Sequence, residues 1–301
     1  MGDETTRSSA PLASGTAMLG KRDEPERDVT AAPAAEAPAI SRYAITFGEV
    51  AILHVGGQEL GEGKMRDEGF TVAELQVARD RINATGGSAQ LVMLSDALPA
   101  GELRDAHEAA VLHVRGGVGT MLADAGAANR MLGEQKEVAY DMKFWHARQR
   151  KTMNKRARHN VLFGVEAQEA SEDYQRCTVA PFSSVPTLEA LRQALPTWLG
   201  PKATLPYAEG NHYFEARSGI GFHGDAERKI VICASLGTTS TLRYQWRCPG
   251  SSEPFGPRID LEVRHGDVYV MSEKATGFDW MRRSQYRVVH AAGHAKYIGA
   301  N

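Results

Sequence analysis

Asn211-His212-Tyr213 and, shortly after it, Gly219-Ile220-Gly221-Phe222-His223-Gly224-Asp225 open the β-rich part of this chain. Alternate residues of an extended backbone point to the same side, so His223 and Asp225 can bind one metal ion together. A third ligand can come from His290, at the end of the β-rich run Arg287-Val288-Val289-His290. Two histidines and one carboxylate leave neighbouring metal positions open, as in the non-haem Fe(II) enzymes that bind a co-substrate and O₂. The pattern therefore predicts a catalytic metal site made by His223, Asp225 and His290.

Short strand-like runs follow one another from about residue 205 to the end of the chain. They are separated by Gly, Pro and Ser turns, and they cover residues 207–215, 229–233, 242–246, 259–263, 268–271, 286–290 and 296–298. Many short strands with such turns predict a two-sheet roll or barrel. We expect the metal site to lie at its mouth.

The chain before residue 105 is expected to fall into two segments. Residues 1–40 are rich in Ala, Pro, Ser, Thr and charge, so they cannot bury enough apolar surface to offset chain entropy, and we predict a disordered tail. Residues 41–104 are predicted to form a small N-terminal α/β region, with strands at 43–47, 50–53 and 91–94. Its helix is expected to start after Thr71, with Glu74 completing a capping box. The main domain, residues 105–301, is expected to include a strand at 109–115 and helices at 129–140 and between Pro186 and Pro196.

The composition is that of an ordinary globular protein, with 42% hydrophobic and 24% charged residues among 301. A net charge of −2 gives no general attraction to nucleic acid or to an anionic membrane. The cysteines are few, odd in number and unpatterned, which favours a reducing compartment over a disulfide framework. The N-terminus lacks a signal peptide's apolar core, and no apolar run is long enough to span a membrane. An intracellular location, cytoplasmic or nuclear, is therefore expected.

One dense basic stretch stands out in this nearly neutral chain, at residues 143–159. Its basic residues are interleaved with Phe144 and Trp145, and they are Lys143, His146, Arg148, Arg150, Lys151, Lys155, Arg156, Arg158 and His159. Cations that neutralise phosphates beside aromatic rings that stack on bases are what a nucleic-acid groove requires. A solvated charged face is the alternative interpretation of the same residues.

The order of these motifs resembles that of the AlkB-like branch of the Fe(II)/2-oxoglutarate-dependent dioxygenases. Asn211-x-Tyr213 precedes His223-x-Asp225, and then follow Ser235-Leu236-Gly237, Leu261-Glu262-Val263-Arg264-His265-Gly266-Asp267-Val268 and finally His290. The resemblance covers roughly residues 105–301. It implies an α+β fold with a double-stranded β-helix, or jelly-roll, core and flanking helices. It also implies Fe(II) ligation by His223, Asp225 and His290, and hydrogen bonds from Asn211 and Tyr213 to 2-oxoglutarate.

The resemblance also suggests where the remaining site residues lie. Family members carry substrate-contacting residues in the segment that contains Arg156, Arg158, His159 and Asn160. They usually supply an arginine after the distal histidine for the far carboxylate of 2-oxoglutarate, whereas no arginine follows His290 in this sequence. Lys296 is expected to take this role, with Arg287 as a weaker candidate. Separately, the polar connection 272–284, with Asp279, Trp280, Arg282 and Arg283, is close in sequence to His290 and is expected for that reason to act as a substrate lid.

These observations predict an oxidoreductase that uses Fe(II), 2-oxoglutarate and O₂ to hydroxylate a substrate C–H bond. One substrate class is N-alkylated nucleobases, which hydroxylation would demethylate, with nucleic acid held by the basic stretch 143–159. The alternative is a hydroxylase of a protein side chain, a free nucleotide or a small metabolite. A binding module that keeps the fold without turnover is a third hypothesis. Loss of oligonucleotide binding on charge reversal at Arg156 and Arg158 would distinguish the first from the second.

Overall fold

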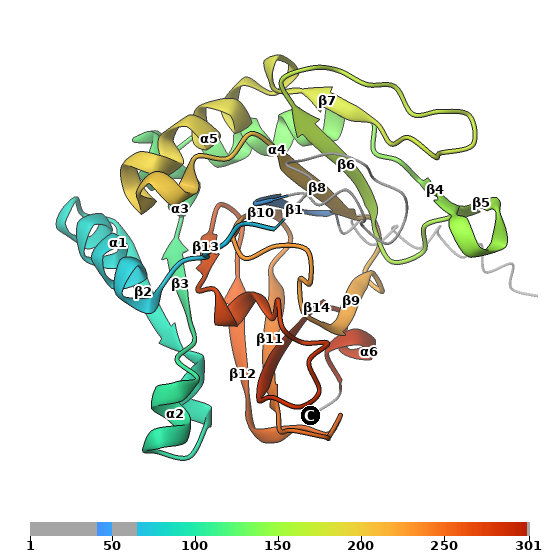
Figure 1. The fold of residues 1–301 in the computed structure, drawn as a ribbon. Coiled ribbons are helices and arrows are strands. Elements are labelled where there is room, and N and C mark those ends of the chain that lie inside the picture. Colours follow the sequence, from blue (N-terminus) through green and yellow to red (C-terminus); the bar gives the residue numbers. More distant parts are fainter. Residues whose placement is uncertain (1–40, 50–64, 300–301) are drawn as a thin grey trace, which may run out of the picture. The chain divides into compact units, whose positions relative to one another are not determined.

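Residues 41–49 and 65–299 are described by the computed structural model shown in Figure 1. The predicted tail at 1–40 and the predicted strand at 50–53 lie outside these residues. The chain is a mixed α+β protein built on a large and a small antiparallel sheet. Within the described part, none of the helices has both the length and the apolar character that a membrane crossing requires.

The large sheet has eight strands, which are antiparallel except for the last pair. In spatial order they are β2 (Ser88–Met93), β3 (Ala110–Arg115), β13 (Val268–Met271), β10 (Val231–Gly237), β1 (Arg42–Phe47), β8 (Ala208–Tyr213), β6 (His159–Gly164) and β7 (Val179–Pro181). The strands alternate faces, as on β1, where Tyr43, Ile45 and Phe47 join the core on the outer face. Arg42, Ala44 and Thr46 therefore point to the inner face.

The small sheet packs against that inner face. It has four strands in the order β12 (Phe255–Val263), β11 (Ser240–Arg247), β14 (Arg287–Gly293) and β9 (Gly219–His223). Tyr244 and Trp246 on β11 and Val288 on β14 share a core with Val231 and Met271 of the large sheet. The two histidines of the predicted metal site thus belong to the small sheet, and the large sheet supplies the facing wall.

Helices cover the outer face of the large sheet, so the protein has three layers (Figure 1). The principal ones are α1 (Val72–Ala84), α3 (Gly117–Leu122), α4 (Ala127–Glu137) and α5 (Pro186–Leu199), and the shorter ones are α2 (Glu102–Ala106), α6 (Ala295–Ile298), η1 (Leu94–Ala97), η2 (Ala147–Gln149), η3 (Phe182–Ser184), η4 (Pro201–Ala203) and η5 (Lys274–Thr276). The capping box of Thr71 and Glu74 is confirmed. The predicted end of α5 at Pro196 is wrong, because the buried stripe continues through Leu195 to Leu199 and holds the last turn against the core.

The expected N-terminal region, residues 41–104, is an integral part of the same compact unit, Pro38–Asn301. Strand β1 is paired on one side with β10 and on the other with β8, in the middle of the large sheet. Strand β2 extends the sheet through β3. The expected division at residue 104 is corrected accordingly, because these strands complete the main sheet and have no separate core.

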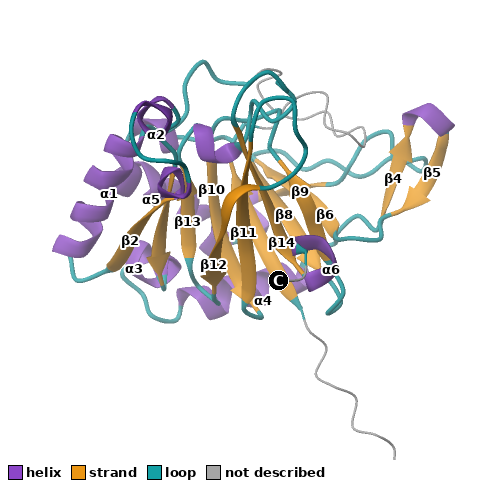
Figure 2. Cartoon of the chain, turned by 90° about the horizontal axis from the view of Figure 1, so that it is seen from below, coloured by secondary structure: helices purple, strands orange, loops and turns teal. Residues whose placement is uncertain are grey.

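The basic stretch forms a two-stranded hairpin, β4 (Lys143–His146) and β5 (Lys151–Asn154), which stands apart from both sheets (Figure 2). Its two ends are joined where the Lys155 amide donates a 2.8 Å hydrogen bond to the Met142 carbonyl. The Asp141 amide donates to the Asn160 carbonyl at 3.0 Å, which attaches the base of the hairpin to β6. The hairpin is thus tied to a strand of the main sheet.

Candidate metal centre

The three predicted metal ligands lie together at one end of the space between the sheets. His223 ends β9 and is the direct cross-strand neighbour of His290 on β14, and Asp225 follows just after β9. The distance from His223 Nε2 to Asp225 Oδ1 is 3.7 Å, and that from His290 Nε2 to Asp225 Oδ2 is 3.9 Å. One ligand atom from each residue lies within 4.8 Å of the others. A metal ion with bonds of about 2 Å requires donor atoms roughly 3 to 4 Å apart, and both His–Asp separations fall in that range.

The surroundings leave both histidines with a nitrogen available for a metal. His223 Nδ1 lies 2.7 Å from the Gly221 carbonyl oxygen, which can only accept, so Nδ1 carries the hydrogen and Nε2 presents its lone pair to Asp225. Burial, with smaller effects from His223 and Arg228, holds the pKa of His290 well below its usual range. His290 is therefore neutral at physiological pH, as a metal ligand must be. Its Nδ1 has no hydrogen-bond partner among the described residues.

The ligand loop is held by close backbone contacts that only glycine permits. A Cβ atom on Gly224 would lie 2.1 Å from the Gly277 carbonyl oxygen and 2.8 Å from Trp280 Cβ. The Asp225 amide next to it donates a 2.9 Å hydrogen bond to the Thr276 carbonyl. The segment around 276–280 therefore fixes the position of Asp225 relative to the two histidines.

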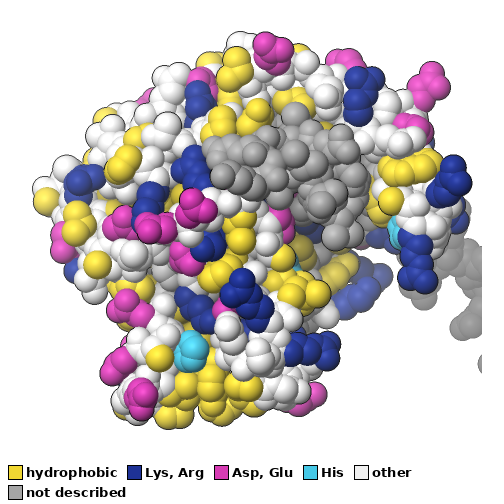
Figure 3. Space-filling model, viewed as in Figure 1, with side chains coloured by type: hydrophobic (Ala, Val, Ile, Leu, Met, Phe, Trp, Pro, Cys, Tyr) yellow, Lys and Arg dark blue, Asp and Glu magenta, His cyan; other side chains and the backbone are white. Residues whose placement is uncertain are grey.

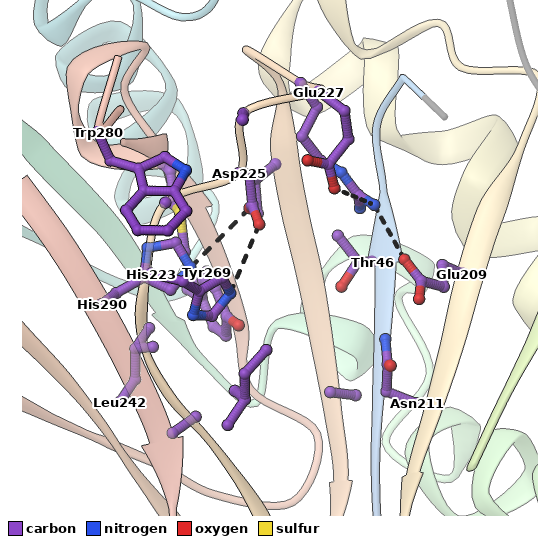
Figure 4. Close-up of a pocket in the computed structure, with 18 of the residues that line it drawn as sticks. Thr46, Glu209, Asn211, His223, Asp225, Glu227, Leu242, Tyr269, Trp280 and His290 are labelled. Carbon is purple, nitrogen blue, oxygen red and sulfur yellow. Dashed lines mark hydrogen bonds and ion pairs between the residues drawn. The ribbon is translucent and has the colours of Figure 1, made fainter. Parts of the chain in front are cut away.

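The metal cluster opens into a cavity of about 550 Å³ between the two sheets (Figure 4). Trp280, Tyr269 and Leu242 line it on the side of the metal ligands. The opposite wall is polar and includes Thr46, Glu209, Asn211 and Glu227. The cavity thus combines a metal end, an apolar surface and a facing wall of hydrogen-bonding groups, which is the usual make-up of a small-molecule site.

Arg228 is the buried cation of the polar wall. Its Nη2 lies 2.9 Å from Glu209 Oε2 and 3.5 Å from Glu227 Oε1. Burial acts to lower the pKa of Arg228, but Glu209 and Asp225 outweigh it and raise that pKa above its ordinary value. In the other direction, burial raises the pKa of Asp225, and Arg228 is the main group that opposes this increase. Arg228 therefore helps Asp225 to stay ionised, as metal binding requires.

Two of the four residues predicted to bind the co-substrate lie in the cavity. Asn211 and Tyr213, on the inner face of β8, both line it. Lys296 does not line the cavity. The predicted strand at 296–298 is wrong, because this segment forms helix α6. Strand β14 ends at Gly293, which has a φ of +105°, and the His294 side chain then accepts a hydrogen bond from the Lys296 amide and starts the helix. Lys296 is exposed, with its ammonium group 5.5 Å from the centre of the Tyr297 ring.

Arg287 also lies away from the cavity. It is buried at the start of β14, where its guanidinium donates hydrogen bonds to the carbonyl oxygens of Trp280, Cys248 and Ser251, at 3.3, 3.3 and 2.5 Å. These contacts anchor the loop that carries Trp280. The expected pairing of Arg287 with a co-substrate is therefore replaced by a structural role.

Arg42, which no sequence motif singled out, lies at the other end of the inter-sheet space. Arg42 is 7% exposed, and its guanidinium carbon lies 3.8 Å from the centre of the Tyr213 ring. A small cavity of about 40 Å³ reaches Arg42 and shares Ala44, Tyr213, Leu242, Tyr269 and Ala292 with the main cavity. Arg42 Nε is buried without a hydrogen-bond partner among the described residues. The only sequence signal was the alternation Arg42-x-Ala44-x-Thr46, which gives a cation to the inner face of a strand.

The predicted substrate residues are scattered. Arg158 lines the cavity, whereas Arg156 is exposed. His159 stacks on Phe214 with ring centres 4.1 Å apart, and the amide oxygen of Asn160 accepts a hydrogen bond from the Lys155 ammonium. In the expected lid, Asp279 is buried in a 2.5 Å ion pair with Lys274, and Arg282 is exposed. Neither of them lines the cavity, and Trp280 between them does.

The hairpin presents several exposed cations. Lys143, Arg148, Arg150 and Lys151 are exposed, and no Asp or Glu occurs between residues 142 and 165. Figure 3 shows Lys and Arg side chains beside apolar ones on this projection, at the right-hand edge of the view. The hairpin base leads directly into Arg158 at the cavity.

Fold and site together define a two-sheet α+β protein with a cluster of two histidines and one carboxylate in its cavity. The chain belongs to the same family as the uncharacterized protein R156 of Acanthamoeba polyphaga mimivirus, with which it is 34% identical over 256 residues, 84% of this chain and 96% of the viral protein. No family model matches the chain.

Proposed function

We propose that the protein is an Fe(II)/2-oxoglutarate-dependent dioxygenase of the AlkB-like type. One observation carries this proposal: a His-Asp-His cluster lines one cavity between the sheets, a buried arginine lines the small cavity beside it, and Tyr213 lines both, with Asn211 in the first. A dicarboxylate bound to a metal at one end requires a cation for its second carboxylate at the other. The chain provides both the metal cluster and the cation.

The arrangement of the sheets supports a double-stranded β-helix. In that interpretation β9 and β14 bring the metal ligands together in the small sheet, and β8 and β10 face them from the large sheet. Strand β1 lies between β8 and β10, although it comes before them in the chain. We propose that β1 takes the place of the strand that carries the co-substrate arginine after the distal histidine in similar enzymes. This would explain why no arginine is needed after His290.

Each residue would have a distinct task. His223, Asp225 and His290 would hold Fe(II), and the planar guanidinium of Arg42 would bind the far carboxylate of 2-oxoglutarate through paired hydrogen bonds. Asn211 and Tyr213 would hydrogen-bond the same molecule along its length, and Trp280, Tyr269 and Leu242 would exclude water. Bound iron would supply the oxidising chemistry, in which 2-oxoglutarate, O₂ and a substrate C–H bond give succinate, CO₂ and a C–OH group.

We propose N-alkylated nucleobases in single-stranded or flipped-out form as the substrate class. Hydroxylation of an N-methyl group gives a hydroxymethyl group, which leaves as formaldehyde and restores the base. The exposed cations of the β4–β5 hairpin can neutralise phosphates, and Phe144 and Trp145 lie among them. Because the hairpin leads into Arg158 at the cavity, a strand bound there could deliver an unstacked base toward the metal.

Anaerobic titration of the Fe(II)-loaded protein with 2-oxoglutarate tests the first part of the proposal. We expect the weak visible charge-transfer band of the metal-bound co-substrate in the unaltered protein and none in Asp225→Ala. Succinate and formaldehyde should then form with a methylated oligonucleotide in air. A protein without 2-oxoglutarate affinity would contradict the enzyme class. Turnover with peptides, free nucleotides or metabolites alone would contradict the substrate class.

A further inference from the structure

The contact between Arg158 and Asn211 joins the basic segment to the predicted co-substrate pocket. Arg158 Nε donates a 2.5 Å hydrogen bond to Asn211 Oδ1. The two residues come from neighbouring strands, because Asn160 on β6 pairs directly with Asn211 on β8 and Arg158 just precedes β6. Asn211 is 7% exposed, and both side chains line the main cavity.

The chemistry of this contact fixes the orientation of the Asn211 amide. A guanidinium has only donors, so the amide atom that faces it must be the oxygen. Both hydrogens of Nδ2 are then left for other acceptors, and no described residue accepts one of them. The cavity is therefore offered two N–H donors, which match a ligand rich in oxygen acceptors. A rotated amide would instead present its oxygen and repel such a ligand.

We propose that Arg158 is a positioning residue for co-substrate binding, because it holds the Asn211 amide with its N–H groups toward the cavity. This inference rests on the proposed 2-oxoglutarate site. It assigns Arg158 a role that does not depend on its charge, unlike the phosphate contact expected of a residue in the basic stretch. The Nε–H is the atom that matters, while the terminal nitrogens remain available to a polyanion.

Substitution by glutamine and by methionine separates these two roles. The side-chain amide nitrogen of glutamine lies at the same place along the chain as Nε of arginine, so Arg158→Gln can keep the donor and removes the charge. Arg158→Met has a side chain of similar length but neither the N–H donor nor the positive charge. Arg79→Met is the matched control, because Arg79 lies on α1 and pairs with Asp80.

The measurement is the affinity for 2-oxoglutarate, from anaerobic titration of the Fe(II)-loaded proteins. We expect Arg158→Met to weaken binding about tenfold, the equivalent of roughly one hydrogen bond, and Arg158→Gln to stay within about threefold of the unaltered protein. Both variants should lose affinity for an oligonucleotide to the same extent, and Arg79→Met should change neither value. Equal loss of 2-oxoglutarate affinity in the glutamine and methionine variants, or no loss in either, would overturn the inference.

Asn211→Asp tests the inference where Arg158→Met does not fold. The carboxylate still accepts a hydrogen bond from Arg158 but offers no N–H group to the cavity, so we expect at least a tenfold loss of 2-oxoglutarate affinity. Unchanged affinity would overturn the inference. If the unaltered protein itself does not bind 2-oxoglutarate, the proposed function fails, and this inference fails with it.

Discussion

The two ends of the cavity are built in different ways. At the metal end, His223 and Asp225 are close in sequence, and His290 joins them because β9 and β14 are adjacent strands of the small sheet. At the far end, Arg42 comes from the beginning of the described chain and enters through β1, between β8 and β10 of the large sheet. A short motif therefore supplies two of the three residues of the candidate metal cluster, whereas the third residue and the arginine at the far end both depend on the order of strands. Substitutions at the two ends test whether both serve one ligand.

Removal of Asp225 should have the largest effect, because it takes the only carboxylate from the metal cluster. We expect Asp225→Ala to lose metal binding by at least about 100-fold and to lose 2-oxoglutarate binding with it. Metal content after equilibrium dialysis is the measurement. Asp80→Ala, at an exposed position of α1, is the control and should retain the metal. Full metal occupancy in Asp225→Ala would show that the cluster is not the metal site.

Arg42→Met compared with Lys296→Met tests the far end directly. A charge-assisted pair in a buried cavity contributes about 2 to 3 kcal/mol, so Arg42→Met should weaken 2-oxoglutarate binding roughly 30- to 150-fold while Fe(II) still binds. Lys296→Met should bind as the unaltered protein does, because Lys296 is exposed on α6. Weaker 2-oxoglutarate binding in Lys296→Met, with unchanged binding in Arg42→Met, would assign the far carboxylate to Lys296.

Gly224→Ala should affect the metal end through the backbone. The added Cβ would overlap the Gly277 carbonyl, so the ligand loop must shift. We expect about a tenfold loss of metal affinity and a decrease of about 1 to 3 kcal/mol in the free energy of unfolding. Gly133→Ala in α4 is the control, since its Cβ would meet nothing within 4 Å, and it should be neutral or slightly stabilising. Unchanged metal affinity in Gly224→Ala would show that the close contact at Gly224 does not position the metal ligands.

The smallest expected effect is a pH dependence that belongs to neither end. His212 lies on the outer face of β8, stacked on Tyr43, and burial together with the neighbouring His159 lowers its pKa to about 4. The unfolded chain therefore binds a proton more readily than the folded one, and stability should fall as the pH decreases from about 6.5 to about 4. Because solvent screens this partly exposed group, we expect the free energy of unfolding to fall by only about 1 kcal/mol between pH 7 and pH 5.

His212→Phe should remove this part of the pH dependence in urea unfolding experiments. The ring can still stack on Tyr43, and it cannot be protonated. An unchanged decrease in stability between pH 7 and pH 5 would assign the effect to other groups. Affinity for 2-oxoglutarate at pH 7 should be the same in this variant, since His212 points away from the cavity that Asn211 and Tyr213 line.

Much of the fold and of the metal end could be predicted because the relevant signals are local. The strand periods, the capping box at Thr71 and the His223-x-Asp225 spacing each depend on neighbouring residues and correspond to observed elements. The exceptions also have physical causes. Gly293 and His294 end β14 and start a helix where a strand was expected, and buried leucines carry α5 past Pro196.

The sequence by itself determined the residue types that can bind a metal, the faces on which they lie and the presence of a basic segment. Only the tertiary structure decided which cations line the space between the sheets. Strand pairing depends on hydrogen bonds and packing between segments far apart in the chain, and no local spacing encodes the position of β1 between β8 and β10. For the same reason, Arg42 and not Lys296 lines the small cavity beside the main one, and Arg158 is in contact with Asn211.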